Sequence, residues 1–378
     1  CDGGGPTTRR VPEQYASSSS AIAASYDGDV VEVGPGTYAE GLNFGGREIT
    51  VRSTAGAGTT IVDPVTGRCL TVNGQKGAGA RLEGFTLRGG SASIGGGVYV
   101  SASSPVLVNC VITGNTATES GGGVYLESGS LQLTGCTVSQ NAAHYYGGGV
   151  TVSGGSLSLE NSVVSGNTLT YTGWSYGGGV YVGGGVVSLA GGGVSGNTAR
   201  SGGGGIYVSS GTVAATDCVV SGNAVTAGAG GGVSAGGALQ LTNCTVSGNT
   251  SAGDGGGLIT YSSAAVSGGS IEQNVAGGYG GAGYVGGGNP LLQSGQVRNN
   301  RSSTVGGAWV QGGSLRVGST NFCGNGVNVN GAWQDLGGNV FQGGCDGGGP
   351  TTRRVPEQYA SISAAIAASY DGDVVEVG

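Results

Sequence analysis

A four-residue pattern recurs through most of this 378-residue chain: a branched residue (a phenylalanine in the last copy), two small or polar residues, and then asparagine. The asparagines recur in the numbering at spacings of 26, 26, 30, 26, 26, 25, 26 and 25 (141 − 115 = 26 for the first pair). A period this constant indicates one structural unit repeated along the chain, so we expect a repeat fold. The repeated asparagines are Asn115, Asn141, Asn167, Asn197, Asn223, Asn249, Asn274, Asn300 and Asn325.

Each period contains segments typical of short β-strands. Glycines and an apolar–Tyr–apolar triplet, such as Val124-Tyr125-Leu126, follow most of the asparagines, and an alternating stretch such as Ser130-Leu131-Gln132-Leu133 comes next. The repeat region has no helical periodicity, so the pattern predicts a parallel β-solenoid whose stacked coils bury their apolar faces. Dividing 344 residues by 26 per coil gives about 13 coils. At about 4.8 Å per coil the rod would be on the order of 60 Å long.

Asparagine and glycine suit the corners of such a coil. Asparagine tolerates the left-handed conformation that a sharp corner needs, and stacked side-chain amides can hydrogen-bond along the axis. We therefore expect the repeated asparagines to form a ladder at a corner. Glycine makes up 89 of the 378 residues, and its clusters are expected at another corner, where a Cβ would clash or φ must be positive.

The end of the chain repeats its beginning. Residues 345–378 match residues 1–34 except for Ser18 against Ile362 and Ser20 against Ala364. This offset of 344 residues predicts a unit that recurs in a longer polymer, and the lack of methionine agrees with that interpretation. We expect three parts: a cap helix and first strand (1–34), a β-helix body (35–344), and the start of the next unit (345–378).

An open solenoid end exposes unpaired strand edges and apolar core, so it needs a cap. Residues 13–25 and 357–369 are predicted to form short amphipathic helices. The second copy would cap or join the tail of the preceding unit, which makes assembly head-to-tail. The apolar residues expected at this assembly junction are Tyr359, Ile362 and Ile366 in the second copy and Tyr15 and Ile22 in the first.

Several of these segments resemble a known family. The stretch from Asp27 to Val33 and the following Gly34-Pro35-Gly36-Thr37-Tyr38 look like the opening of right-handed parallel β-helix proteins of the pectate-lyase-like superfamily. The Gly-Gly-x-Val and Val-x-x-Asn elements are similar to those of polymorphic outer-membrane and large secreted bacterial surface β-helix proteins. The resemblance implies an all-β, right-handed parallel β-helix with coils of about 26 residues and a short N-terminal cap helix.

Acidic residues are few and scattered. Those within residues 90–322 occupy different coils and different phases of the repeat, so no pair is positioned for acid–base catalysis. We expect no catalytic residue, no cofactor and no metal site. The net charge of −7 and the absence of a basic stripe argue against a nucleic-acid partner, and no apolar run reaches the length of a membrane span. The acids are Glu119, Glu127, Glu160, Asp217, Asp254 and Glu272.

Two groups of aromatic residues stand out. The first should form an exposed ridge in one turn of two consecutive coils, the second of which carries a four-residue insertion. Local packing, contact between fibres and sugar binding all remain open for it. The residues of the second group occupy the same position in their repeats, and we expect them to form an exposed ladder that points outward. The ridge contains His144, Tyr145, Tyr146, Tyr171, Trp174 and Tyr176, and the ladder contains Tyr99, Tyr125, Tyr181, Tyr207, Tyr284 and Trp309.

The cysteines fall into two kinds. Cys110 with Cys136, and Cys218 with Cys244, lie one period apart at one phase, which favours inward-facing thiols in adjacent coils and leaves a disulfide open. Cys323 and Cys345 bracket the terminal aromatic segment. They are a candidate disulfide, either within the unit or across a unit junction, which would suit an extracellular compartment.

The sequence therefore favours a non-enzymatic structural repeat unit of an extracellular or cell-surface filament. The expected partners are copies of the same unit, joined head-to-tail through the duplicated segment. A carbohydrate-binding or adhesin β-helix is the alternative, with polysaccharide as partner, and a polysaccharide lyase or hydrolase is third. A row of outward hydroxyls from Thr113 to Ser247 raises ice binding, but serine dominates where paired threonines would be expected.

Overall fold

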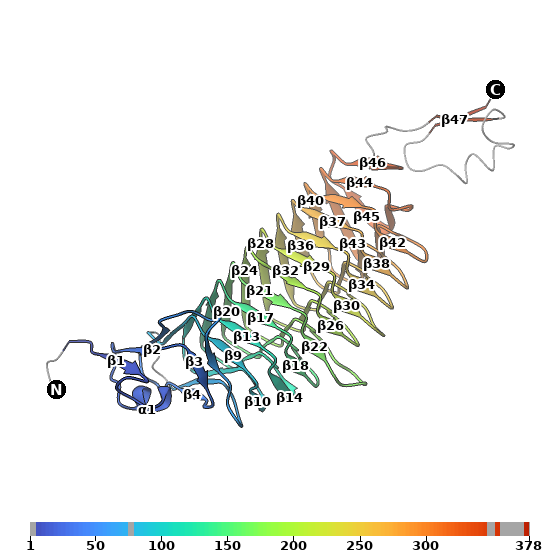
Figure 1. Cartoon of the computed structure of the whole chain (residues 1–378). Coiled ribbons are helices and arrows are strands. Elements are labelled where there is room, and N and C mark those ends of the chain that lie inside the picture. Colours follow the sequence, from blue (N-terminus) through green and yellow to red (C-terminus); the bar gives the residue numbers. More distant parts are fainter. Residues whose placement is uncertain (1–4, 75–78, 346–351, 356–373, 378) are drawn as a thin grey trace.

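The computed structural model describes residues 5–74, 79–345, 352–355 and 374–377. The chain forms a right-handed parallel β-solenoid of about 12 turns, with about 26 residues in each turn (Figure 1). The fold class expected from the sequence is confirmed. The expected 13 coils is slightly too many, because that calculation divided the whole 344-residue unit, including its N-terminal cap, by the length of one coil.

Three parallel sheets run along the rod. The largest receives two strands from each regular turn and has 24 strands in all. In chain order these are β1 (Thr8–Val11), β2 (Val30–Val33), β4 (Leu42–Asn43), β5 (Thr50–Ser53), β7 (Leu70–Asn73), β8 (Arg81–Glu83), β11 (Val98–Ser101), β12 (Val106–Val108), β15 (Val124–Leu126), β16 (Ser130–Thr134), β19 (Val150–Val152), β20 (Ser156–Glu160), β23 (Val180–Val182), β24 (Val186–Ala190), β27 (Ile206–Val208), β28 (Thr212–Thr216), β31 (Val233–Ala235), β32 (Ala238–Thr242), β35 (Leu258–Thr260), β36 (Ala264–Ser267), β39 (Gly283–Val285), β40 (Leu291–Gln293), β43 (Ala308–Gly318) and β45 (Val329–Asp335).

The second sheet has 13 strands and carries the branched residues that precede the repeated asparagines. Its strands are β3 (Gly36–Tyr38), β6 (Thr60–Val62), β9 (Thr86–Arg88), β13 (Val111–Thr113), β17 (Thr137–Ser139), β21 (Val163–Ser165), β25 (Gly193–Ser195), β29 (Val219–Ser221), β33 (Thr245–Ser247), β37 (Ser270–Glu272), β41 (Gln296–Arg298), β44 (Asn321–Cys323) and β46 (Val340–Gln342).

The third sheet follows the asparagines directly and has nine strands. Its strands are β10 (Ser91–Ile94), β14 (Thr116–Ser120), β18 (Ala142–Ala143), β22 (Thr168–Leu169), β26 (Thr198–Ala199), β30 (Ala224–Val225), β34 (Thr250–Ser251), β38 (Val275–Ala276) and β42 (Arg301–Ser302).

Equivalent residues of successive turns stack in register. Val138 pairs with Val164, and Leu131 pairs with Leu157. All these side chains are buried, so the interior consists of columns of similar apolar residues. This arrangement pairs each strand with the turns before and after it, as the repeat pattern predicts.

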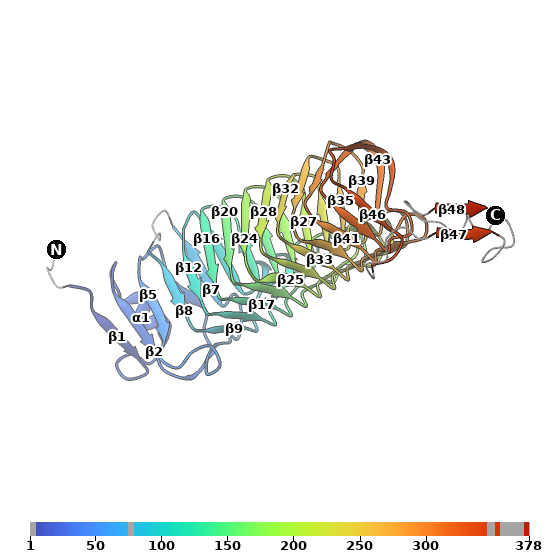
Figure 2. The same ribbon diagram turned by 90° about the horizontal axis from the view of Figure 1, so that it is seen from above.

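A short helix closes the N-terminal end (Figure 2). Helix α1 (Ser18–Ala23) begins after Ser17, whose hydroxyl accepts a hydrogen bond from the backbone N–H of Ser20. Ile22 is buried, and α1 packs against β1, β2 and β4. The expected helix over 13–25 was too long, because the backbone N–H groups of Gln14 and Tyr15 both donate to Arg10 O and hold this stretch in a turn after β1.

The second copy of the duplicated segment is described only in part. Strands β47 (Thr352–Val355) and β48 (Val374–Val377) pair in parallel, with Thr352 opposite Val374. In the first copy, Thr8 lies opposite Val30. The two pairings share one register, because Thr352 and Val374 are the counterparts of Thr8 and Val30 in the duplication. The helix expected over 357–369, with Tyr359, Ile362 and Ile366, lies outside the described residues.

Candidate functional sites

The repeated asparagines form a continuous buried ladder, as expected. Asn223 is typical: its side-chain Nδ2 donates to Oδ1 of Asn249 at 2.9 Å and to the backbone oxygen of Val194 at 2.9 Å. Its backbone N–H also donates to Oδ1 of Asn249 at 3.0 Å. Asn223 is fully buried. The ladder thus satisfies a row of backbone groups that the corner of the coil removes from water.

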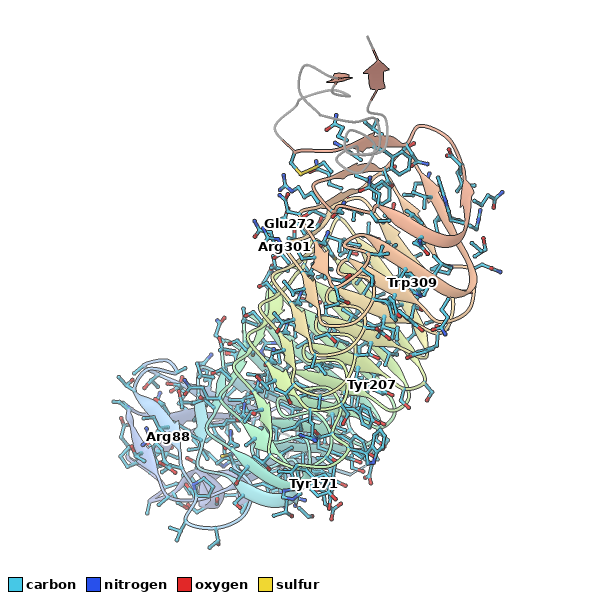
Figure 3. All side chains as sticks on the ribbon, turned by 90° about the vertical axis from the view of Figure 1, so that its right-hand side faces the viewer. Arg88, Tyr171, Tyr207, Glu272, Arg301 and Trp309 are labelled. Atoms are coloured by element: carbon cyan, nitrogen blue, oxygen red, sulfur yellow. A yellow bond between two sulfur atoms is a disulfide. The ribbon has the colours of Figure 1, made fainter. Side chains whose placement is uncertain are left out.

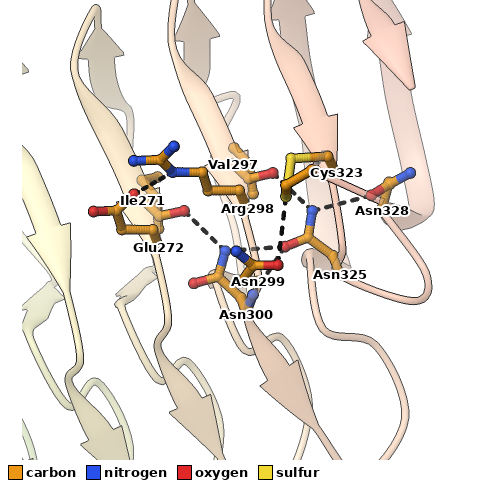
Figure 4. Close-up of a disulfide and its surroundings, with 10 residues drawn as sticks. Ile271, Glu272, Val297, Arg298, Asn299, Asn300, Cys323, Asn325 and Asn328 are labelled. Atoms are coloured by element: carbon orange, nitrogen blue, oxygen red, sulfur yellow. Dashed lines mark hydrogen bonds and ion pairs between the residues drawn. A yellow bond between two sulfur atoms is a disulfide. The ribbon is translucent and has the colours of Figure 1, made fainter. Parts of the chain in front are cut away.

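Both ends of the ladder have partners. At the first member, Oδ1 of Asn115 accepts from the backbone N–H of Gly90 at 2.9 Å and contacts the Cys69 thiol at 3.3 Å. At the last, Nδ2 of Asn325 donates to Oδ1 of Asn328 at 3.0 Å (Figure 4). No hydrogen-bond partner was predicted from the sequence for the first or the last member of the ladder. Asn328 lies outside the repeated four-residue pattern.

One expectation about this corner was wrong. The ladder asparagines do not adopt the left-handed conformation; the residue immediately before each of them does, for example Gly114 with φ 65° and Gln140 with φ 54°. The asparagine is instead required by its side-chain hydrogen bonds. Glycine is the usual residue at the preceding position because it enters this conformation without strain.

A second column of small side chains was not anticipated. Five residues before each ladder asparagine lies a cysteine, serine, threonine or glycine, such as Cys136, Ser162 and Thr320. The Ser162 hydroxyl donates to the backbone oxygens of Leu133 and Glu160, both at 3.0 Å, and the Cys136 thiol makes the equivalent contacts with Leu107 and Thr134. A sequence signal for this column was present: cysteine in some turns and serine in another occupy the same position of the repeat, five residues before the asparagine.

The cysteine pairs of adjacent coils lie in this column as buried free thiols. Cys110, Cys136, Cys218 and Cys244 are all buried, and none of them forms a disulfide. Burial raises the pKa of Cys69 to about 12 and also raises that of Cys110. Each of the four thiols in the column also contacts two backbone oxygens, so they act as small hydrogen-bonding core residues.

The aromatic ladder is much less exposed than expected. Tyr284 is 7% exposed, and Tyr181 and Tyr207, stacked with ring centres 5.7 Å apart, are half-buried. The glycine-rich loop before each triplet folds over the outer face of the strand, so a Cβ on Gly203 would lie 2.7 Å from Cβ of Tyr207. The sequence showed that these rings face away from the core but not that this loop covers them.

The aromatic ridge forms where it was expected, in one turn of two consecutive coils. The Tyr171 ring lies 4.9 Å from the Tyr145 ring and 5.4 Å from the His144 ring. Tyr146 stacks on Tyr176 at 6.3 Å and also covers Tyr181 at 4.5 Å, which ties the ridge to the ladder. Trp174, in the turn that carries the four-residue insertion, is 75% exposed.

The ridge and ladder share one side of the rod. Figure 3 shows Tyr207 and Trp309 along one side, whereas Glu272 and Arg301 lie along the opposite side. Ring stacking accounts for Tyr145, Tyr146, Tyr171 and Tyr176. Within the part of the chain that the structure describes, no ring stacks on Trp174.

The acidic residues considered for catalysis are spread over different turns. Glu127 accepts hydrogen bonds from the hydroxyls of Tyr99 and Ser101, both at 2.6 Å. These hydrogen bonds lower the pKa of the Glu127 carboxyl. Glu272 forms an ion pair with Arg298 of the next turn. The partners of Glu127 and Glu272 are thus hydroxyl and guanidinium groups.

The last turns are held by a disulfide and three aromatic rings. Cys323, at the end of β44, is bonded to Cys345, with the two Cα atoms 5.1 Å apart. Phe341 of β46 stacks on Phe322 with ring centres 5.1 Å apart, and Trp333 packs edge-on against Phe341 at 5.9 Å. Figure 4 shows Cys323 beside Asn299 and the last ladder residues.

The hand, the parallel register and the stacked columns define a right-handed parallel β-solenoid. The family model described as "Right handed beta helix region" matches residues 66–191 of the chain. Comparison with curated proteins and with solved structures found no significant match. The chain is a β-helix repeat protein. In the part of the chain that the structure describes, no helix is long and apolar enough to cross a membrane.

Proposed function

We propose that this chain is a non-enzymatic structural unit of an extracellular or cell-surface filament, assembled head-to-tail through the duplicated segment. The observation that supports this most directly is the shared strand register. The described strands of the second copy, β47 and β48, pair as β1 and β2 do in the first. A second copy whose two described strands pair as in the first is what the start of a following unit would require.

The two ends of the solenoid support the same proposal. At the N-terminal end, α1, β1 and β2 cover the first turn. At the other end, β45 pairs with β43 and β46 pairs with β44. Strand edges left open would recruit further strands, so the start of a following unit is the natural cover for this end. The disulfide between Cys323 and Cys345 suits an oxidising compartment.

Lengthening the chain by one unit tests the proposal. We would compare the present chain with a two-unit chain, in which residues 1–344 are followed directly by residues 1–378, by electron microscopy and small-angle scattering. The expected result is one continuous rod of about twice the length, because docked solenoid ends continue the stack. Two rods joined at variable angles, or native material consisting only of dispersed single rods, would contradict head-to-tail assembly.

The absence of enzymatic activity is tested separately. The chain would be incubated with a panel of neutral and acidic polysaccharides, and new reducing ends or unsaturated products would be measured. We expect no cleavage, because the acids lie in different turns and several are engaged by neighbouring hydroxyl or guanidinium groups. Cleavage that persists in protein freed of contaminating enzymes would overturn the non-enzymatic role.

Carbohydrate binding at the aromatic ridge is the second candidate, and the exposure of Trp174 favours it. An exposed indole offers a flat apolar surface of the kind that stacks on sugar rings. Glycan-array binding should fall at least tenfold in Trp174→Ala and stay unchanged in Tyr261→Ala, a matched exposed aromatic 56% accessible elsewhere. Equal binding by both variants, or no glycan binding by the wild-type chain, would rule out this role.

A further inference from the structure

We propose that the Cys323–Cys345 disulfide is a covalent link between consecutive units, and that Cys323 therefore accepts Cys1 of a second copy as it accepts Cys345. This inference rests on the proposed head-to-tail function. The arithmetic is direct: 345 − 344 = 1, so Cys345 occupies the first position of the next unit. Cys323 is thus the acceptor at the tail of one unit, and the first residue of the following unit is its partner.

The two cysteines that compete for this acceptor have the same sequence surroundings. Residues 1–16 and 345–360 are identical, and both begin Cys-Asp-Gly-Gly-Gly-Pro-Thr-Thr-Arg-Arg. Any feature of the tail that recognises the residues after Cys345 will also recognise those after Cys1. Cys1 lies outside the described residues, so this equivalence rests on the sequence alone.

The acceptor site lies in the last turns of the solenoid. Cys323 is 6% exposed, whereas Cys345 is half-buried and lies at the surface. The Cys345 sulfur lies 3.4 Å from Oδ1 of Asn299, and a Cβ added to Gly324 would come within 3.2 Å of that sulfur. At the position of Gly324, most earlier turns also carry glycine, and only Gln140, Gln273 and Asn299 place a side chain there. Glycine at position 324 leaves the space that the incoming sulfur occupies.

A surface groove begins beside this sulfur. It is lined by Gln273, Val275, Asn299, Arg301 and Gly324, so Asn299 and Gly324 belong to both the groove and the acceptor site. Arg301 supplies a positive charge, and the residue after the cysteine is an aspartate in both copies. The tail therefore offers an opposite charge as well as space to the segment that it is proposed to accept.

The exchange needs no external oxidant. The thiolate of Cys1 from a second copy attacks Sγ of Cys323, the Cys323–Cys345 bond breaks, the Cys323–Cys1 bond forms, and Cys345 leaves as a thiolate. One disulfide and one thiolate are present before and after the step. Because the entering and leaving thiols have the same neighbours, the two disulfides should be similar in stability. The tether then favours Cys345, at an effective concentration in the millimolar range.

Removing that tethered competitor makes the proposal testable. The acceptor would be the C1S/C345S variant, which leaves Cys323 free while the five other described cysteines stay buried. It would be mixed, under a glutathione redox buffer, with a fluorescent peptide of residues 1–10 or with a scrambled peptide that keeps one cysteine. We expect the native peptide to couple roughly tenfold faster than the scrambled one, and to require Cys323. Equal coupling of both peptides, or coupling that survives C323S, would overturn the proposal.

The full-length chain provides the second measurement. After incubation in the same glutathione redox buffer, whose oxidised glutathione supplies the oxidant, C345S should form a ladder at multiples of 36.2 kDa in non-reducing gels, whereas C1S/C345S should remain monomeric. Peptide mapping should find the Cys1–Cys323 linkage, and its absence would overturn the inference. The outcome is separable from the proposed function: a two-unit rod without this linkage refutes only the covalent link, whereas specific coupling with flexibly joined rods refutes only rigid stacking.

Discussion

Except in Asn325, whose side chain also donates to nearby Asn328, the side chain of each ladder asparagine bonds only to neighbouring turns. Asn223 donates three hydrogen bonds, two to Asn249 and one to Val194. Its Oδ1 accepts two from Asn197. A buried amide so fully used cannot be replaced by an apolar residue without leaving several polar groups unpaired. Asparagine is therefore required here by the hydrogen bonds between stacked turns and not by the backbone conformation of the corner.

The substitution Asn223→Ala should therefore destabilise the chain by about 3–5 kcal/mol, because it leaves two N–H donors of Asn197 without their acceptor and removes one hydrogen bond each from Val194 O and Asn249 Oδ1. Urea unfolding followed by circular dichroism measures this. The matched control is Ser221→Ala, two residues earlier on the outer face, which should change stability by less than about 0.5 kcal/mol. Similar midpoints for the two variants would contradict a structural role for the ladder.

At the scale of single elements, the cap around α1 depends on one carboxylate. Oδ1 of Asp29 accepts from the backbone N–H and the hydroxyl of Thr7 at 2.7 and 2.9 Å, and Oδ2 accepts from the backbone N–H of Tyr26 at 2.8 Å and from Arg9. Burial by itself raises the pKa of Asp29, but these hydrogen bonds outweigh it and lower the pKa to about 2. The ionised carboxylate thus joins β1 to the loop before β2.

This shift predicts a pH dependence. The contribution of Asp29 is fully present above its unfolded pKa of 3.8 and is lost as pH falls through the folded value of about 2. In Asp29→Asn, stability at neutral pH should fall by about 1 kcal/mol, after allowance for nearby solvent. The gap between wild type and variant should close between about pH 4 and pH 2 in thermal melts. A gap that stays constant over this range would show that ionisation of Asp29 does not stabilise the cap.

A second feature at this scale is a small apolar cavity of about 40 Å³ near the C-terminal turns. One inward column holds Val180, Ile206, Val233 and Leu258 in successive turns, and then Gly283 and Ala308. The loss of side-chain volume at the last two positions explains the cavity. Leu258, Gly283 and Ala308 all line it.

Ala308→Val should raise stability by about 1 kcal/mol, because it adds buried methyl groups next to the unfilled space. The control is Val180→Ala, in a filled turn of the same column, which should cost about 2 kcal/mol. Denaturant unfolding of both variants measures the two changes. If Ala308→Val lowered the midpoint instead, the residues around the cavity would be unable to admit a larger side chain.

The sequence predicted the period, the parallel stacking and the ladder, because each depends on contacts between equivalent residues of successive turns. It did not correctly predict the features that depend on how the segments of a single turn pack against one another. The left-handed residue was assigned to the asparagine and not to Gly114 or Gln140, since either position could form the corner. The tyrosine ladder was expected to be exposed, because no periodic signal shows that Gly203 and its equivalents fold over it. The residues expected at the assembly junction remain predictions where they lie outside the described residues.

At the scale of the whole molecule, each turn contacts only its neighbours, so the rod should tolerate loss of one complete turn. Deleting residues 198–223 joins Asn197 to Ala224. Ala224 pairs with Thr198 in the adjacent turn, so it occupies the equivalent position and can follow Asn197 in its place. The shortened chain should fold with the same circular dichroism spectrum and a length reduced by about 4.8 Å in small-angle scattering.

The control deletes half as many residues, 198–210, which puts every later side chain out of phase with the turn beneath it. We expect that variant to lose its cooperative transition, because inward and outward positions no longer stack. Equal tolerance of both deletions would mean that the columns and the ladder do not fix the register. Loss of folding in the whole-turn deletion would show that the rod depends on contacts beyond adjacent turns.

The asparagine ladder also gives the rod a direction. Each side-chain amide accepts at Oδ1 from the N-terminal side and gives one of its two Nδ2 hydrogen bonds towards the C-terminal side, so the nine amides are oriented the same way and can polarise one another. The acceptor terminus is at Asn115 and the donor terminus is at Asn325. Two rods brought together tail to tail would oppose their amide dipoles, whereas continuation in the same direction keeps every dipole aligned. Further units would therefore extend the rod only in the same orientation.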